Sequence, residues 1–319
     1  MSRRPILLLV NPTAGGKLGS GPGLTDDPGD LEPDALAAAL AARGLDVETH
    51  QLAKDDDVIA LATRAAEGGR DVVVAGGDGT VSAAARGLVE TDATLGILAM
   101  GSFNNIARGL AVPRHLPEAI EAIAQGRSGG VDVGFARRGD EEPEFFFESG
   151  GVGMDAELFM AAEAGQQHGL RVALSRAWRA LRGRRQPLRL VVDDRTIVTS
   201  ALFVTVSNGP YYGWGFTIAA DADVTDGLME VSIFSRMSTW ATIRHFLSVT
   251  RGRYRYEPRI RRLRAHRIMI EGRRRALPTH VDGRPLGPTP ITFEAIRGGL
   301  RVYRDPELAQ RAAEALGEQ

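Results

Sequence analysis

The first 130 residues alternate short apolar runs with segments in which apolar residues recur every three to four positions. The runs suit buried strands and the recurring segments suit helices. We expect strands at 6–10, 47–50, 72–75 and 95–99. We expect helices at about 33–43, 56–67 and 81–88. Alternation of this kind predicts an α/β domain with a doubly wound parallel sheet, in which ligands bind at the carboxyl ends of the strands.

After residue 128 the pattern changes to short alternating strands separated by Gly, Pro and Asp, which is typical of an antiparallel β-sandwich. We expect these strands at 131–135, 144–147, 188–192, 197–207, 228–234, 267–271 and 291–295. A long helix is expected at about 156–181 and a last helix at about 304–319. The predicted domains are therefore 1–128, with the last helix packing back on it, and 129–303.

Length and composition exclude several classes of protein. The chain has 319 residues, of which 43% are hydrophobic, so it can bury a full core. No segment approaches the roughly 18 apolar residues of a membrane-spanning helix, and the apolar run after Arg4 is too short for a signal peptide. With no cysteine, disulfides and thiolate chemistry are excluded, and a cytoplasmic location is expected.

The net charge of −1 hides an uneven distribution. Residues 1–130 carry a net charge of −6, and residues 131–319 carry +5. Arginines gather at 171–185, with six and no acid, and at 251–275, with eleven against two glutamates. Such clusters attract anionic surfaces, so one interpretation is peripheral contact with the inner face of the plasma membrane. The alternative is a solvated face in an arginine-rich protein.

The segment 71–88 reads DVVVAGGDGTVSAAARGL and places three glycines between a strand and a helix. Glycines there let a ligand approach the main chain, and the N–H groups at the helix start can bind phosphate. Asp78 among these glycines would repel a bare phosphate, so it indicates a metal ion or a transferable proton. The loop therefore favours magnesium-nucleotide chemistry, and the alternative is a tight corner without function.

Two further loops are expected at the same edge of the sheet, namely NPTAGGK at 11–17 and GSFNN at 101–105. Three glycine- or asparagine-rich loops at one edge are stronger evidence for a phosphate site than any one of them.

Eight motifs occur in order along the chain: NPTAGG, GGDGTVS, GSFNNIARGL, VDVG, GGVGMDAE, SNGPYYGWG, DADVTDGLMEV and THVDGRPL. In this order and spacing, the sequence resembles the diacylglycerol kinase catalytic-domain family, bacterial lipid kinases related to sphingosine kinases. The resemblance implies a first domain like those of NAD kinases and phosphofructokinases, a lipid-binding sandwich, ATP and Mg²⁺ as cofactors, and phosphate transfer to a lipid hydroxyl.

By position, the resemblance also implies the residues of the site. Those expected at ATP are Asn11, Pro12, Thr13, Ala14, Gly15, Gly76, Gly77, Asp78, Gly79, Thr80, Val81, Ser82, Ser102 and Asn104. A structural metal would be held by the carboxylate of Asp226 and the carbonyls of Asp223 and Leu228, oxygen ligands that suit Mg²⁺. Asp78 is expected near the magnesium of the nucleotide.

The sequence departs from the family pattern where Asp-Gly-Glu is usual, because Arg284 follows Asp282-Gly283. The family assigns that Glu as the base, and a permanent cation cannot accept a proton. We therefore expect Asp282 to take this role. Ala83, Asn105 and Thr225 also stand where the family has acidic residues.

Several alternatives stay open. One is a kinase of a soluble substrate, like an NAD kinase, and another is a silent lipid- and nucleotide-binding pseudokinase. The histidines show no metal-ligand spacing, although His280 lies two residues from Asp282. Tyr254 and Tyr256 make a poor stacking platform, so no nucleic-acid partner is expected. The sequence leaves open which lipid is used and whether the chain forms a homodimer.

Overall fold

The computed structural model describes residues 3–14, 32–157 and 185–304, apart from 214, 236, 239, 242–243, 246–247, 249–256 and 258. The chain divides into two compact units. Within the described residues, unit 1 contains the chain up to Asp132 and again from Arg297 to Arg304, and unit 2 runs from Val133 to Ile296. The helices predicted at 156–181 and 304–319 lie outside the described residues, apart from Ala156, Glu157 and Arg304.

Unit 1 contains the predicted parallel sheet. Its strands are β1 (Ile6–Val10), β2 (Val47–Gln51), β3 (Asp71–Gly76) and β4 (Thr94–Ala99). The order β2–β1–β3–β4 places β1 and β3 at the centre, with Ile6 opposite both Val47 and Asp71. Strand β2 therefore lies on one side of β1, and β3 and β4 lie on the other side, so the strand order reverses at β1. This reversal is the topological switch point at which doubly wound sheets bind ligands.

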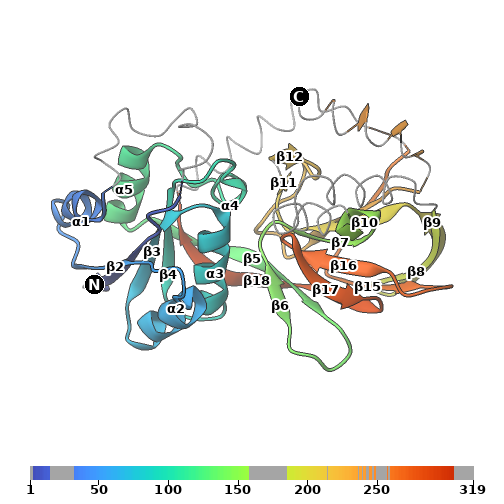
Figure 1. Ribbon diagram of the computed structural model, residues 1–319, viewed down its shortest axis with the longest axis horizontal. Helices are drawn as coiled ribbons and strands as arrows, with labels where there is room; N and C mark the ends of the chain where they lie inside the picture. Colours follow the sequence, from blue (N-terminus) through green and yellow to red (C-terminus); the bar gives the residue numbers. More distant parts are fainter. Residues whose placement is uncertain are drawn as a thin grey trace. The chain divides into compact units, whose positions relative to one another are not determined.

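Helices cover the faces of this sheet (Figure 1). They are α1 (Pro33–Ala41), α2 (Val58–Glu67), α3 (Asp78–Leu88), α4 (Asn105–Gly109) and α5 (Leu116–Gln125). Leu36 of α1 and Ile120 of α5 share one apolar cluster with Val73 of β3. Because side chains alternate along a strand, Val72 and Val74 point to the opposite face. There α2 and α3 lie so close that a Cβ on Gly87 would come within 2.5 Å of the Ile59 carbonyl.

Unit 2 is the predicted antiparallel sandwich. One sheet has β7 (Ser149–Gly153), β10 (Phe203–Ser207), β13 (Met229–Ile233), β14 (Arg261–Ala265), β16 (Pro278–Val281) and β17 (Arg284–Pro288). The strands of the facing sheet are β8 (Gln186–Val192), β9 (Arg195–Ala201) and β15 (Arg267–Gly272) with β18 (Ile291–Tyr303). The remaining strands are β5 (Ser128–Arg137), β6 (Glu144–Phe146), β11 (Tyr211–Tyr212) and β12 (Phe216–Thr217). Leu190, Val231 and Phe293 from the two sheets meet in one buried core.

The structure corrects three sequence-based predictions. The single strand expected at 197–207 is wrong, because the chain leaves β9 and enters β10 in the other sheet, and both segments are apolar enough to look continuous. Strand β18 is far longer than 291–295 and continues from unit 2 into unit 1, where it pairs with β4. Helix α3 begins at Asp78 rather than Val81, so Gly79 lies inside the helix.

None of the helices in the described part of the chain has the length and apolar character needed to span a bilayer.

Candidate phosphate-transfer site

The start of α3 offers backbone donors at the switch point. Gly77 occupies the N-cap position with no side-chain cap, and the Val81 N–H donates to the Gly77 carbonyl at 3.0 Å. The N–H groups of Asp78, Gly79 and Thr80 therefore have no acceptor within the helix. Gly79 is exposed, and a Cβ placed on it would have no neighbour within 4 Å. This combination suits an anion.

Asn11, at the end of β1, ties the first loop to α3. Its Nδ2 donates to the Thr80 Oγ1 at 2.8 Å, and its Oδ1 accepts from the backbone N–H and the hydroxyl of Thr13 at 3.0 and 2.8 Å. The carboxamide of Asn11 thus closes its own turn and links two loops that lie about seventy residues apart in the sequence. These contacts show that Asn11 positions the loop by its side chain.

The third loop touches the second through glycines. A Cβ on Gly101 would lie 2.7 Å from the Gly77 Cα and 2.8 Å from the Asn104 Oδ1. Asn104 has a φ of 51° and its carboxamide accepts from the Gly101 N–H and donates to the Gly101 carbonyl, both at 2.8 Å. The side chain of Asn104 therefore shapes its loop. Together the contacts bring all three sequence-predicted loops to one edge of the sheet.

Asp78 joins the glycine loop to α4. Its Oδ1 accepts from the backbone N–H of Ile106 at 3.0 Å, beside the backbone of Asn104 and Asn105. Burial raises the pKa of Asp78, although the backbone donors act in the opposite direction. The carboxylate thus stabilises the start of α4, a role that the sequence did not reveal.

The remaining ATP-binding residues predicted in unit 1 differ in their exposure. Val81 and Ser82 are buried within α3, so their side chains pack in the core. Ser102 is exposed in the third loop. Pro12 and Ala14 lie in the turn after β1, and Gly15 lies outside the described residues.

In unit 2, Asp282 occupies the tip of the β16–β17 hairpin. Asp282 and Gly283 have φ values of 43° and 76°, and positive φ at both central positions is what a type I′ turn requires. The Oδ1 of Asp282 accepts from the N–H groups of Glu148 and Ser149 at 3.0 and 3.1 Å, and its Oδ2 accepts from Phe147 at 2.9 Å. Removal from water raises the pKa of Asp282, while these donors lower it.

Arg284 links β17 to β6. Its Nη1 lies 2.9 Å from the Glu144 Oε2, and its Nη2 donates to the Phe145 carbonyl at 2.8 Å. The cation that breaks the family's Asp-Gly-Glu pattern therefore has partners within unit 2. Glu144, which the sequence analysis did not single out, is the acid that accommodates it.

In the loop predicted to hold a structural metal, the carboxylate of Asp226 already has partners. The Asp226 Oδ1 accepts from the Leu228 N–H at 2.9 Å, and its Oδ2 lies 3.8 Å from the Arg264 Nη1. Arg264 also pairs with Glu230 at 2.5 Å and donates to the Asp221 carbonyl. Asp223 closes a turn with Thr225. Both oxygens of Asp226 have partners, and Arg264 supplies the positive charge that an ion would bring. Among the described residues, no three His, Asp or Glu side chains group as metal ligands.

A buried polar cluster in unit 2 escaped the sequence analysis. His280 Nε2 lies 3.1 Å from the Asp155 Oδ2, and the Tyr212 hydroxyl donates to the Asp155 Oδ1. Burial, with Asp155 nearby, raises the pKa of Tyr212 well above its usual value. No spacing in the sequence connects these residues, which lie on three separate segments. They meet because Gly151 leaves room where a Cβ would lie 2.0 Å from Asp155.

Two family models match the chain. The diacylglycerol kinase catalytic domain matches residues 5–136, and the YegS C-terminal NAD kinase β-sandwich-like domain matches residues 151–304. The two models correspond to the loops of unit 1 and to the sandwich of unit 2.

The chain is similar to a diacylglycerol kinase of Mycobacterium tuberculosis, with 29% identity over 248 residues, covering 76% of this chain and 80% of that protein. It has the fold of a crystal structure of a diacylglycerol kinase from Bacillus anthracis, with a TM-score of 0.71, 22% identity, and coverage of 97% and 99%. An NAD kinase of Archaeoglobus fulgidus in complex with ATP gives a TM-score of 0.53 at 11% identity, with coverage of 98% and 99%. The two matched regions make this chain similar to the diacylglycerol kinase catalytic domain over residues 5–136 and to the YegS C-terminal NAD kinase β-sandwich-like domain over residues 151–304.

Proposed function

We propose that this protein transfers the γ-phosphate of ATP to the hydroxyl group of a lipid. The observation that carries the proposal is the convergence of three loops on the N–H groups of α3 that have no acceptor within the helix, at the switch point of a parallel sheet. Backbone donors fixed in this way stabilise phosphate charge without reorganisation during the reaction.

In the proposed reaction the lipid oxygen attacks the γ-phosphorus. The bond between this phosphorus and the bridging oxygen breaks, ADP leaves, and the hydroxyl proton passes to a base. Mg²⁺ would accompany ATP and neutralise its oxygens, with Asp78 as the nearest acid of the glycine loop.

Asp282 is the base that we propose. Its Oδ1 already accepts two N–H groups and its Oδ2 accepts one, so Oδ2 keeps one lone pair for an incoming proton. Burial favours the protonated form, which supports proton uptake. Arg284 cannot replace Asp282 in this role, because a guanidinium is always protonated.

We also propose that the substrate is diacylglycerol-like, phosphatidylglycerol or a sphingoid lipid, reached by peripheral contact with a membrane. Exposed Arg273 and Arg274 of the 251–275 cluster support this contact, as does Trp240 with 71% exposure. Of the other proposed contact, 171–185, the structure describes only Arg185. Vesicle flotation at low and high salt tests the contact, since attraction by arginines weakens with ionic strength.

Radiolabelled ATP offered with vesicles of diacylglycerol, phosphatidylglycerol, sphingoid base, ceramide or polyprenol tests the activity. We expect label in one lipid class and none in NAD offered without vesicles. Label in NAD would favour a kinase of a soluble substrate. Binding of ATP without any labelled product would favour a silent pseudokinase.

A further inference from the structure

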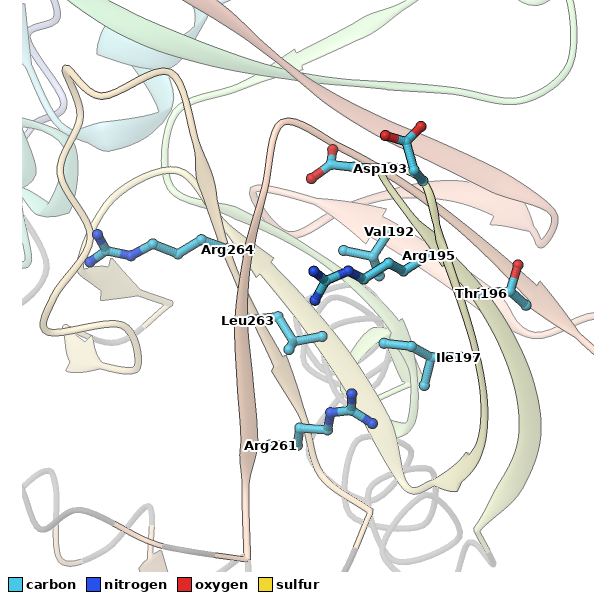
Figure 2. A pocket seen from close by; sticks show the side chains of 9 residues that line it. Val192, Asp193, Arg195, Thr196, Ile197, Arg261, Leu263 and Arg264 are labelled. Carbon is cyan, nitrogen blue, oxygen red and sulfur yellow. The ribbon is translucent and has the colours of Figure 1, made fainter.

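A pocket of about 860 Å³ lies at one edge of the sandwich in unit 2 (Figure 2). It is lined by β9 and β14 and by the turn between β8 and β9. Strand β9 is the last strand of one sheet, and β14 is the last strand of the other. The pocket therefore opens where the two sheets of the sandwich end.

The wall of the pocket is apolar because it continues into the core. Val192 is buried within the sandwich core, and Ile197 and Leu263 are half-buried and pack against it. A ligand with a hydrocarbon part would remove these side chains from water without disturbing the core. Contact with such surface stabilises a ligand roughly in proportion to the apolar area covered.

Three arginines, Arg195, Arg261 and Arg264, line the pocket. Arg195 and Arg261 are exposed and extend into the pocket from opposite strands, whereas Arg264 extends away (Figure 2). Within the described part of the chain neither Arg195 nor Arg261 forms an ion pair, while Arg264 is neutralised by Glu230 and Asp226. Two guanidinium groups that share one opening repel each other, and an anion between them removes this repulsion.

Among the described residues, the acids of the pocket form no ion pair with Arg195 or Arg261. Asp193 accepts a hydrogen bond from the Arg267 N–H at 2.9 Å and so serves the β8–β9 turn. Asp194 is exposed beside it in the same turn. The opening therefore combines an apolar wall with two arginines that lack carboxylate partners among the described residues.

We propose that this pocket binds one anionic phospholipid, with its phosphate between Arg195 and Arg261 and the start of an acyl chain against Ile197 and Leu263. The volume falls within the range of about 300–1,000 Å³ that is typical of ligand sites. None of the residues proposed for ATP binding or proton transfer lines it, so binding requires neither nucleotide nor turnover. Free phosphate shares the headgroup chemistry but has no part that the apolar wall can hold.

Titration of the full chain with dihexanoyl phosphatidylglycerol, below its critical micelle concentration and without ATP, tests the proposal. We expect saturable one-to-one binding by calorimetry, with methyl NMR shifts at Ile197 and Leu263. Dihexanoyl phosphatidylcholine and inorganic phosphate should each bind about ten-fold more weakly or worse. The first lacks the net negative charge, and the second lacks the apolar part.

The double variant Arg195→Ala/Arg261→Ala should weaken binding by about ten-fold or more, and Ile197→Thr should weaken it by several-fold. The matched control Arg137→Ala/Arg297→Ala removes the same charge from exposed positions outside the pocket and should change affinity by less than about two-fold. If both double variants lose lipid affinity equally, the arginines act only through general electrostatic attraction, and the specific site is refuted. Equal affinity for inorganic phosphate would leave a simple anion site, and absence of lipid binding would overturn the proposal.

A separate kinase assay distinguishes these failures from failure of the proposed function. Lost lipid binding with intact phosphate transfer would refute only the pocket, and intact binding without transfer would refute only the enzyme.

Discussion

The two units organise their polar groups in opposite ways. In unit 1 the candidate site that we propose consists of backbone N–H groups, and the side chains of Asn11 and Asn104 hold the loops. In unit 2 charged side chains make the main polar contacts. Asp282, Arg284 and Arg264 each contact several partners. The comparison teaches that the glycine loops of unit 1 depend on the shape of the backbone, whereas the polar contacts of unit 2 depend on pairing between charged side chains and their partners.

The largest effect on turnover is expected for substitution of Asp282, the residue of unit 2 that we propose as the base. Asp282→Asn removes the proton acceptor, and turnover should fall by about 10²–10⁴-fold with ATP affinity nearly unchanged. One N–H would also face an amide donor, which costs about 1–3 kcal/mol of stability. Assays below the melting temperature separate the two effects, and Asp194→Asn is the exposed control. Unchanged turnover would move the base elsewhere.

The next largest effect tests whether the stability and ATP affinity of unit 1 depend on close contact between the backbones of two loops. Gly101→Ala forces a Cβ against the backbone of Gly77, so we expect a loss of about 1–3 kcal/mol in stability and at least about ten-fold in ATP affinity. Calorimetry with Mg-ATP and thermal unfolding measure both quantities.

Gly79→Ala is the matched control for Gly101→Ala, because its Cβ enters open space at the start of α3. Its stability should hold or rise slightly, since alanine favours a helix. A fall in ATP affinity without a fall in stability would locate phosphate there. Normal affinity in both variants would contradict the proposed site.

A smaller effect tests whether charges in unit 2 are exchangeable. Arg284→Glu places two carboxylates together and should cost about 1 kcal/mol, since the pair with Glu144 is only half-buried. Adding Glu144→Arg should recover most of the loss in thermal unfolding. If the reversed pair also raises turnover, the acid at position 284 is the better base, and if turnover stays constant Asp282 suffices.

Arg264→Gln asks whether a guanidinium replaces a metal in unit 2. The change frees the carboxylates of Asp226 and Glu230, so Mg²⁺ should then stabilise the variant by about 1 kcal/mol at roughly five times its Kd. Wild-type protein should show no such increase without nucleotide. A clear increase in the wild type would show that the loop takes a metal despite Arg264.

The smallest effect concerns pH in unit 1. Because burial raises the pKa of Asp78, the folded state holds its proton more tightly than the unfolded chain. Its contribution to stability is present below the unfolded pKa of about 3.9 and is lost as pH rises through the folded value. Relative to Asp78→Asn, the wild type should therefore lose unfolding free energy over this window in urea titrations. If the difference in unfolding free energy between the wild type and Asp78→Asn does not vary with pH, the raised pKa of Asp78 is contradicted.

Much of the fold could be predicted because it follows from local periodicity. The β1–β4 alternation, the sandwich and the three loops came from patterns of two and 3.6 residues together with glycine positions. The switch of sheets between β9 and β10 did not, because apolar alternation reports burial and not which sheet a strand joins. The glycine-rich strand β7 was missed for the related reason that it lacks side chains that show a pattern.

The candidate site likewise has some features that the sequence predicted and others that only the structure revealed. The sequence by itself determined which backbone segments could bind phosphate, because glycines and helix starts are local features. Only the tertiary structure decided that Asp78 stabilises α4, that Arg284 pairs with Glu144, and that Asp155 meets His280 and Tyr212. These side chains come from segments far apart in the sequence. Their partners depend on strand pairing and packing, which no single stretch of residues encodes.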